Sequence, residues 1–398
     1  MENEGWNKEM NHHHQRVYLL MVLLLVLFLA GCWDRVEIED RGFVVGAAVD
    51  LPKKSAKKNE IKLTNQFVVP SGWGAPSQGS SGEDPAYANV AATGKSLFAI
   101  DRKMAAMTSR SPYLSDMKLI AVSSELAKTK LFENVMDLFI RDQEMRRGVK
   151  VVIAEDDAAG ILNIVPESEK LPVMHIESVM ENNFQHLGNL KPLRVGDLHE
   201  RLLGGNSFII PKVMKKGDSM KYQGAAVFHG DSNRMVGAMN VQETKGYNLL
   251  TGEVNGGSIK AKHDDESIIL ELKKVNSSMK VRATKKPVID VSIHTEAHAE
   301  IAESFTTSSL RSKEKFQSIE KKAEKKMEQL MKTTIQKAQE DWKADILGVG
   351  EKLHKYQYDI WQTVKKDWDK GKNYFSEANV DVTANINVET TGITEQTK

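Results

Sequence analysis

Three hydrophobic patterns follow one another along the chain. Residues 17–30 form a continuous apolar run. Between residues 40 and 165, short apolar runs typical of buried strands alternate with stretches in which apolar positions recur every three or four residues. This β–α alternation predicts a layered α/β-type domain over residues 33–206. Short apolar runs separated by turn residues then predict a small β-rich middle domain over residues 207–284.

The last part of the chain has the clearest periodicity. Residues 288–301 and 380–388 alternate polar and apolar side chains, which is typical of half-buried strands. Between them, residues 310–346 carry apolar positions mostly three or four apart, and this spacing predicts one long amphipathic helix. A second helix is expected over residues 353–368. We therefore predict that residues 285–398 form a domain in which a long helical hairpin packs on a β-sheet.

The whole chain is thus expected to have an α+β fold with three domains of mixed architecture. Its 55 basic and 54 acidic residues give a formal net charge of +1, so it lacks the basic excess of a nucleic-acid-binding protein. The single cysteine excludes an intramolecular disulfide framework and a cysteine-rich metal site.

The apolar run at residues 17–30 is 14 residues long. A membrane-spanning helix needs about 20 apolar residues, whereas the core of a signal peptide needs only about 7–15. The length therefore predicts a signal peptide over residues 1–32. Translation could start at Met1 or at Met10, because starting at Met10 removes the acidic residues that precede the run.

The sequence Leu-Ala-Gly-Cys ends this run, with Cys32 as its last residue. An aliphatic residue, two small residues and a cysteine form the pattern of a bacterial lipobox. We expect cleavage between Gly31 and Cys32, with diacylglyceryl and N-acyl groups on Cys32. Two or more acyl chains would hold the mature protein firmly on the outer face of a membrane. The alternative is an ordinary signal peptide with an incidental cysteine.

No stretch of the sequence predicts catalysis, a metal site or a cofactor. The Gly94-Lys95-Ser96 sequence resembles the end of a phosphate-binding loop, but Asn89 stands where that motif needs glycine. His294 and His298 lie in an alternating stretch, and residues four apart on a strand are about 13 Å apart. They cannot share one zinc ion, whose ligands lie at about 2 Å.

The sequence after the lipobox resembles the start of the Ger(x)C family, the C subunit of spore germinant receptors. Cys32, Trp33, Asp34, Glu37 and Asp50 carry this resemblance. Many family members have a histidine roughly where Asp116 and Met117 stand in this chain. Further family motifs are matched by Thr93, Gly94, Arg141, Asp142, Gly224, Ala226, Val227, Phe228, Asp345, Leu347, Gly348, Gly350 and Trp361.

The resemblance implies three α+β domains without a known enzymatic site, in which the motif residues are structural or lie at interfaces. It also implies a diacylated lipoprotein on the outer face of the spore inner membrane. Such a protein would serve germination beside two integral membrane subunits, and the membrane subunits would be the better candidates for binding the nutrient. The alternative is a solute-binding lipoprotein of an ABC-type importer, which needs two similar α/β lobes with a cleft between them.

Overall fold

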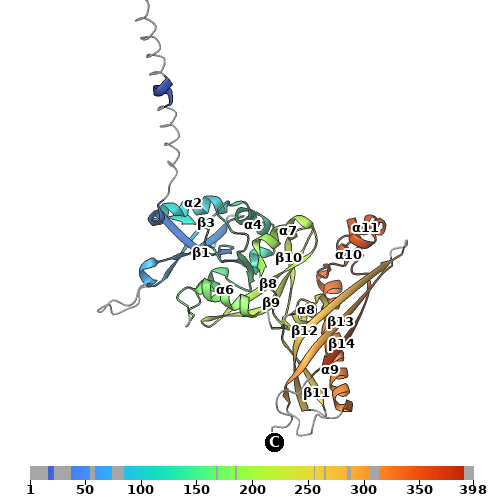
Figure 1. The fold of residues 1–398 in the computed structure, drawn as a ribbon. Coiled ribbons are helices and arrows are strands. Elements are labelled where there is room, and N and C mark those ends of the chain that lie inside the picture. The colour runs from blue at the N-terminus through green and yellow to red at the C-terminus, as the bar shows by residue number, and fades with distance from the viewer. Residues whose placement is uncertain are drawn as a thin grey trace, which may run out of the picture.

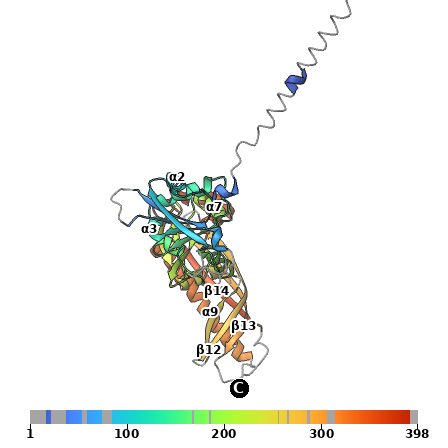
Figure 2. The same ribbon diagram turned by 90° about the vertical axis from the view of Figure 1, so that its left-hand side faces the viewer.

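The computed structural model describes residues 17–21, 37–53, 59–73, 85–166, 169–183, 186–254, 256–263, 266–284, 288–304 and 313–389. Within these residues the molecule is elongated, with one sheet at the end where the chain enters and a second sheet extending away from it (Figures 1 and 2). Helices and strands are mixed throughout, so the predicted α+β fold class is confirmed.

The first sheet has the strand order β10-β9-β8-β6-β5-β1-β2-β3, with β4 paired to β1 and β7 paired to β6. Its central strands β1, β5, β6 and β8 are parallel, and the outer pairs are antiparallel. The strands are β1 (Arg41–Asp50), β2 (Ile61–Val68), β3 (Tyr87–Gly94), β4 (Ser111–Tyr113), β5 (Leu119–Ser123), β6 (Lys150–Ala154), β7 (Leu193–Arg194), β8 (Phe208–Lys216), β9 (Ser219–His229) and β10 (Arg234–Met239).

Helices cover both faces of this sheet. One core joins it to α2 (Leu97–Met107), α3 (Ser124–Ala127), α4 (Leu131–Arg141) and α7 (Val195–Gly204). A second core joins the opposite face to α5 (Ala158–Ile161) and α6 (Pro172–Asn183). Burial on both faces explains why the central strands are continuous apolar runs instead of alternating ones.

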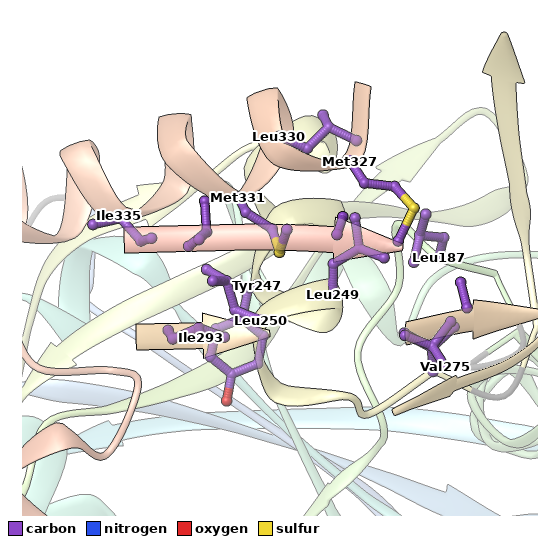
Figure 3. Packing of buried hydrophobic residues seen from close by; sticks show 14 of the residues in the cluster. Leu187, Tyr247, Leu249, Leu250, Val275, Ile293, Met327, Leu330, Met331 and Ile335 are labelled. Atoms are coloured by element: carbon purple, nitrogen blue, oxygen red, sulfur yellow. The ribbon is translucent and has the colours of Figure 1, made fainter. Parts of the chain in front are cut away.

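The second sheet has the order β11-β12-β13-β14, with the last pair parallel and the others antiparallel. One face packs against α8 (Val241–Thr251) and α9 (Lys313–Gln336). Figure 3 shows this core, in which Met327 and Met331 point from α9 toward Leu187 and Leu249. The other face is in solvent, which produces the alternation seen in the sequence. The strands are β11 (Ser258–His263), β12 (Glu266–Ala283), β13 (Ile289–Ser304) and β14 (Asn379–Val388).

The free backbone edge of β14 is held by glutamates of α9. The amides of Ala384, Ile386 and Val388 donate to the carboxylates of Glu328, Glu324 and Glu320 at 3.4, 3.3 and 3.0 Å. Two residues of strand advance about 6.6 Å and four residues of helix about 6 Å, so the two repeats stay matched over three contacts. The helix therefore covers an edge that could otherwise pair with another strand.

The predicted helical hairpin is only partly correct. The first helix packs on the sheet as expected, but α9 ends at Gln336 and a π-helical turn (Lys337–Trp342) follows. The left-handed Lys343, with φ of 51°, ends this segment before the glycines that were expected to do so. The second helix is broken into α10 (Val349–Tyr356) and α11 (Tyr358–Val364), with a 3-10 turn at Lys365–Asp367.

Tertiary contacts explain the early end of α9. Trp342 lies against Gly237 of β10, where a Cβ would come within 2.3 Å of the indole ring. The side-chain amide of Asn373 also donates to the carbonyl of Lys343 at 2.9 Å. Neither contact is visible in the hydrophobic period of residues 310–346, which therefore predicted too long a helix.

The strands of residues 207–284 do not form a middle sheet of their own. Strands β8, β9 and β10 extend the first sheet, whereas β11 and β12 belong to the second. Strand β9 contributes to the cores of both sheets. Ala226 and Phe228 lie in the core between the first sheet and α4, and Ala225 and Val227 lie in the core of the second sheet. Because hydrophobic alternation does not show which sheet a strand joins, the pattern suggested a separate unit. How the chain divides into independently folding domains stays a prediction.

Within the described part of the chain, no helix is long and apolar enough to cross a membrane.

Candidate functional site

The residues predicted for cleavage and lipidation, Gly31 and Cys32, lie outside the described residues, as do Trp33 and Asp34 of the first motif. Lipid attachment therefore stays a prediction. Glu37 is the first described residue after Cys32, and it is exposed just before the 3-10 turn η2 (Ile38–Asp40).

Asp50, at the end of β1, fixes the start of α5. Its buried carboxylate accepts hydrogen bonds from the backbone amides of Ala158 and Ala159, at 2.7 and 3.1 Å. The pKa of Asp50 is raised to about 6, mainly by burial. The neighbouring Asp157 contributes to this rise, and the two amides oppose it. The carboxylate is thus used to join a central strand to a helix, which is a structural role.

The motif residues around α2 and α4 lie at the edge of the first sheet. Gly94 ends β3, where a Cβ would come within 2.9 Å of Ile100, and Thr93 beside it is exposed. Arg141 is exposed and pairs with Asp137 at 2.7 Å, while Asp142 accepts the amide of Glu144 at 2.8 Å. Arg141 and Asp142 have side chains available at the surface, in contrast to Asp50.

Gly224 and Phe228 belong to the shared strand β9. Gly224 has φ of +102°, and a Cβ there would lie 2.2 Å from the carbonyl oxygen of Met239, so only glycine fits without a backbone shift. The buried ring of Phe228 stacks on Phe208 with centroids 5.0 Å apart and contacts Phe132 at 4.7 Å. These motif residues hold the centre of the first core.

The last motif folds around the buried carboxylate of Asp345. It accepts hydrogen bonds from the amides of Val349 and Gly350, at 3.1 and 2.7 Å, and from the indole of Trp368 at 2.8 Å. Burial raises the pKa of Asp345, and these donors oppose the shift. A Cβ on Gly350 would lie 2.6 Å from Trp368, so the glycine permits this close packing.

Gly348 and Trp361 complete the same motif. Gly348 has φ of +74° at the N-terminus of α10, a conformation that favours glycine. Trp361 is half-buried and meets Trp368 edge to face, with ring centroids 5.8 Å apart. The structure therefore brings Asp345, Gly348, Gly350 and Trp361 together, as part of one wall.

That wall borders a polar cleft of about 560 Å³ between the two sheets. Direct hydrogen bonds join its sides: Ser207 donates to Asp369 at 2.5 Å, Asn206 donates to Glu351 at 3.0 Å, and Lys370 donates to Asp231. The lining residues are Arg201, Gly204, Gly205, Asn206, Ser207, Asp231, Tyr247, Thr251, Glu253, Asp345, Ile346, Leu347, Gly348, Glu351, Trp361, Lys365, Lys366, Trp368, Asp369 and Lys370.

Sequence reasoning missed the opposite wall of this cleft. Asn206 and Ser207 follow a glycine pair, a pattern that by itself indicates only a turn. Their partners lie more than 140 positions further along the chain, so no local pattern could join them. The one available signal was the presence of two hydroxyl- or amide-bearing side chains directly after the turn.

The cleft has charged groups of both signs and an aromatic floor, which suits binding of a polar segment or ligand. Among the described residues, no group of three His, Cys, Asp or Glu side chains is placed to hold a metal ion. His294 and His298 lie on the open face of β13, where they contact Thr383 at 2.9 Å and Glu389 at 2.6 Å, respectively. Asp116, at the position of the family histidine, is half exposed and lies 3.9 Å from Arg146.

Comparison with known families accounts for these motifs. Residues 34–215 match the sequence model described as the spore germination protein N-terminal domain. Residues 223–392 match the model described as spore germination B3/GerAC like, C-terminal. The chain belongs to the Ger(x)C family. The two matches follow one another in chain order and together include every family-motif residue from Asp34 to Trp361.

Relatives of this Ger(x)C protein are found in Bacillus subtilis (strain 168). Spore germination protein YndF is 29% identical over 93% of this chain and 95% of its own length. Spore germination protein B3 is 27% identical, over 88% and 92% respectively. The crystal structure of the GerBC protein has the same fold, with a TM-score of 0.57 and 21% identity; the match covers 85% of this chain and 97% of that chain. A role related to germination follows from this membership.

Proposed function

We propose that this chain is a non-enzymatic, lipid-anchored subunit of a nutrient germinant receptor and is required for spore germination. In this proposal it acts on the outer face of the spore inner membrane together with integral membrane A- and B-type subunits. The observation that carries the proposal is the ordered match of both germination-protein models over residues 34–215 and 223–392.

The lipid anchor is supported by the sequence before the described part of the mature chain. Cys32 is the only cysteine, and it follows the apolar run at the spacing of a lipobox. One acyl chain gives only reversible membrane binding, whereas a diacylglyceryl group gives stable attachment. A receptor subunit that must stay beside integral membrane partners needs this second kind of attachment.

The state of the motif carboxylates supports a non-enzymatic role. Asp50 uses its carboxylate to bind two backbone amides, and Asp345 accepts three donors. Both groups therefore complete helix starts, and their oxygens are occupied by backbone amides and an indole instead of being presented to a substrate. The surfaces that remain for binding are the polar cleft and exposed motif residues such as Arg141.

The importer alternative finds no support. A solute-binding protein of that kind needs two similar α/β lobes. The two sheets of this molecule differ: the first is mixed and covered by helices on both faces, and the second is mostly antiparallel and covered on one face. The curated relatives reported above are also spore germination proteins.

The experiment that tests this proposal is the substitution Cys32→Ala in the full chain. We expect the variant to lose acyl labelling, to leave the membrane fraction and to abolish nutrient-triggered germination, while its thermal unfolding midpoint stays unchanged. As a control, a single membrane-spanning helix in place of residues 1–32 should restore both attachment and germination. A Cys32→Ala protein that remains anchored in spores that germinate normally would contradict the proposal.

A further inference from the structure

Helix α2 exposes an unusual outer face. Its inner side chains Leu97, Ile100 and Met104 are buried in the first core. Met107, three residues after the buried Met104, is 58% exposed, and Phe98 is 57% exposed. The outward face, called the α2 face below, consists of Phe98, Ala99, Arg102, Lys103, Ala106 and Met107.

The α2 face is apolar and basic. The Arg102 guanidinium lies 5.2 Å from the centroid of the Phe98 ring, and neither Arg102 nor Lys103 forms an ion pair with a described residue. Asp101 is the acidic residue of this helix and lies on the flank of the helix. Its pKa is raised to about 6, mainly by burial and next by the neighbouring Asp142. The face therefore combines two exposed large apolar side chains with two cations, and at its margin Phe98 also borders a groove that contains Asp137 and Asp142 of the neighbouring α4 segment.

This face lies at the end of the molecule where the chain enters. Strand β4, which follows α2, pairs with the start of β1, with Ser111 opposite Arg41. Arg41 directly follows η2, and Ile38 in that turn is 68% exposed. Both views show α2 beside this entry point and the second sheet directed away from it (Figures 1 and 2).

The proposed anchor keeps the α2 face near the bilayer. Ile38 is six residues after Cys32, and six extended residues span at most about 20 Å. The 11-residue helix is about 16 Å long, so its whole length can lie against a surface within that reach.

We propose that the α2 face docks onto the phospholipid surface that carries the Cys32 anchor, with Arg102 and Lys103 at its centre against lipid phosphates and Phe98 and Met107 at its two margins, at headgroup level. This inference rests on the lipid anchoring proposed above. Interfacial helices use this combination of aromatic or aliphatic and basic side chains. Because Glu37, Glu39 and Asp40 flank Ile38, the contact is made by α2 and not by η2.

Docking through α2 sets the orientation of the whole molecule. The long axis would stand away from the membrane, and the open face of the second sheet and the polar cleft would be held beside neighbouring membrane subunits instead of against lipid. A lipid tether alone leaves this orientation free, so the α2 face would supply the second contact that fixes it.

The test uses the full lipidated chain reconstituted into vesicles. In Phe98→Cys the introduced thiol is the only free one, because Cys32 is acylated, and it is labelled with an environment-sensitive dye. The control is Asn385→Cys, at an exposed position on β14. On vesicles of phosphatidylglycerol and phosphatidylethanolamine, we expect a blue shift and quenching by lipid-borne quenchers at position 98 only.

The contribution of Arg102 and Lys103 to docking is measured with the same dye at position 98. Each cation near an anionic surface is worth about fivefold in binding, so Arg102→Gln with Lys103→Gln should lower the docked-to-free ratio by about 25-fold. Vesicles of phosphatidylcholine alone should reproduce this loss in the labelled Phe98→Cys chain that keeps Arg102 and Lys103.

The outcomes separate the two proposals. A chain that does not float with vesicles would overturn the anchor and this inference together. A chain that floats while the label at position 98 stays as water-exposed as the label at 385 would overturn only the docking. If the label stays in water but the charge variants block germination, the α2 face binds a protein partner, and the lipid assignment is wrong.

Discussion

The two sheets of this molecule are stabilised in different ways. In the first sheet, every residue of β5 and β6 is buried, and helices cover both faces. In the second, β13 alternates buried and exposed residues, and only one face is covered. The first sheet therefore depends on close packing on both sides, whereas the second depends on α8 and α9 holding one face and one edge.

The difference also separates the motif residues by role. Gly224 and Phe228 belong to the packed scaffold, and Asp50 fixes a helix to a central strand. Asp345 likewise satisfies a helix start, but it does so in the wall of the polar cleft. A buried carboxylate that accepts backbone amides thus serves the core in one region and shapes a surface in the other.

The largest expected effect is on the doubly covered sheet. Phe228→Ala removes a ring buried against Phe208 and Phe132, and we expect the free energy of unfolding to fall by about 3–5 kcal/mol. Urea denaturation measures this, with the exposed Val236→Ala on the neighbouring strand as control, for which we expect less than about 0.5 kcal/mol. A loss below 1 kcal/mol at Phe228 would show that the core can collapse around the cavity, contrary to two-sided packing.

The second effect is a pH dependence from the first sheet. Asp50 has a pKa of about 6 in the folded chain, against an ordinary value of about 3.9 in the unfolded one. Between pH 4 and 6 the native state therefore holds a proton that the unfolded state has released. The free energy of unfolding should fall as pH rises, by at most about 1.4 kcal/mol per pH unit for one proton.

The substitution Asp50→Asn should make this slope shallower by one proton's share, without abolishing it. Asp101, with a pKa of about 6, and Asp345, with a raised pKa, contribute in the same direction. Urea unfolding at pH 4, 5, 6 and 7 provides the comparison, and Asp101→Asn, outside the strand–helix junction, should make the slope shallower by its own proton's share. An unchanged slope in Asp50→Asn would refute the assigned protonation.

A smaller effect is expected at the edge of the second sheet. Glu324→Ala removes the acceptor for the Ile386 amide, and we expect a loss of about 0.5–1.5 kcal/mol and faster hydrogen exchange at that amide. Glu324→Gln keeps an acceptor oxygen and should change both quantities less. Unchanged exchange at Ile386 in the alanine variant would mean that α9 does not hold this edge.

The smallest stability effect is expected at an exposed motif position. Arg141→Ala breaks an ion pair between two exposed side chains on α4, which should cost less than about 0.5 kcal/mol. If this variant still impairs germination, Arg141 lies at an interface, since its contribution to folding is small. A drop in unfolding free energy above 1 kcal/mol, measured by urea denaturation, would instead give it a structural role.

Periodicity predicted the fold best where one face is in solvent. The alternation of β13 and β14 and the apolar positions of α9, such as Ile319, Met327 and Leu330, lie in the structure as expected. The pattern of residues 207–284 predicted a β-rich region but not that its strands divide between the two sheets, because their pairing depends on contacts far along the chain. The end of α9 depends on Trp342 meeting Gly237, which is a tertiary contact.

The candidate site was predicted only in part. Family resemblance selected Asp345, Gly348, Gly350 and Trp361, which the fold places together. It gave no indication of Asn206 and Ser207, because these residues meet their partners only after the two sheets have packed together. Short motifs report local geometry such as a helix start or a left-handed glycine, and a cleft between distant segments lies beyond them.

Membership of a membrane receptor complex can be decided by affinity purification of the full lipidated chain from spore inner membranes. We predict that two multi-span membrane proteins copurify with it in comparable amounts, and that the association weakens when Cys32→Ala releases the chain from the membrane. Recovery of the chain without a multi-span partner, or with the permease of an importer, would contradict the assignment as a germinant-receptor subunit.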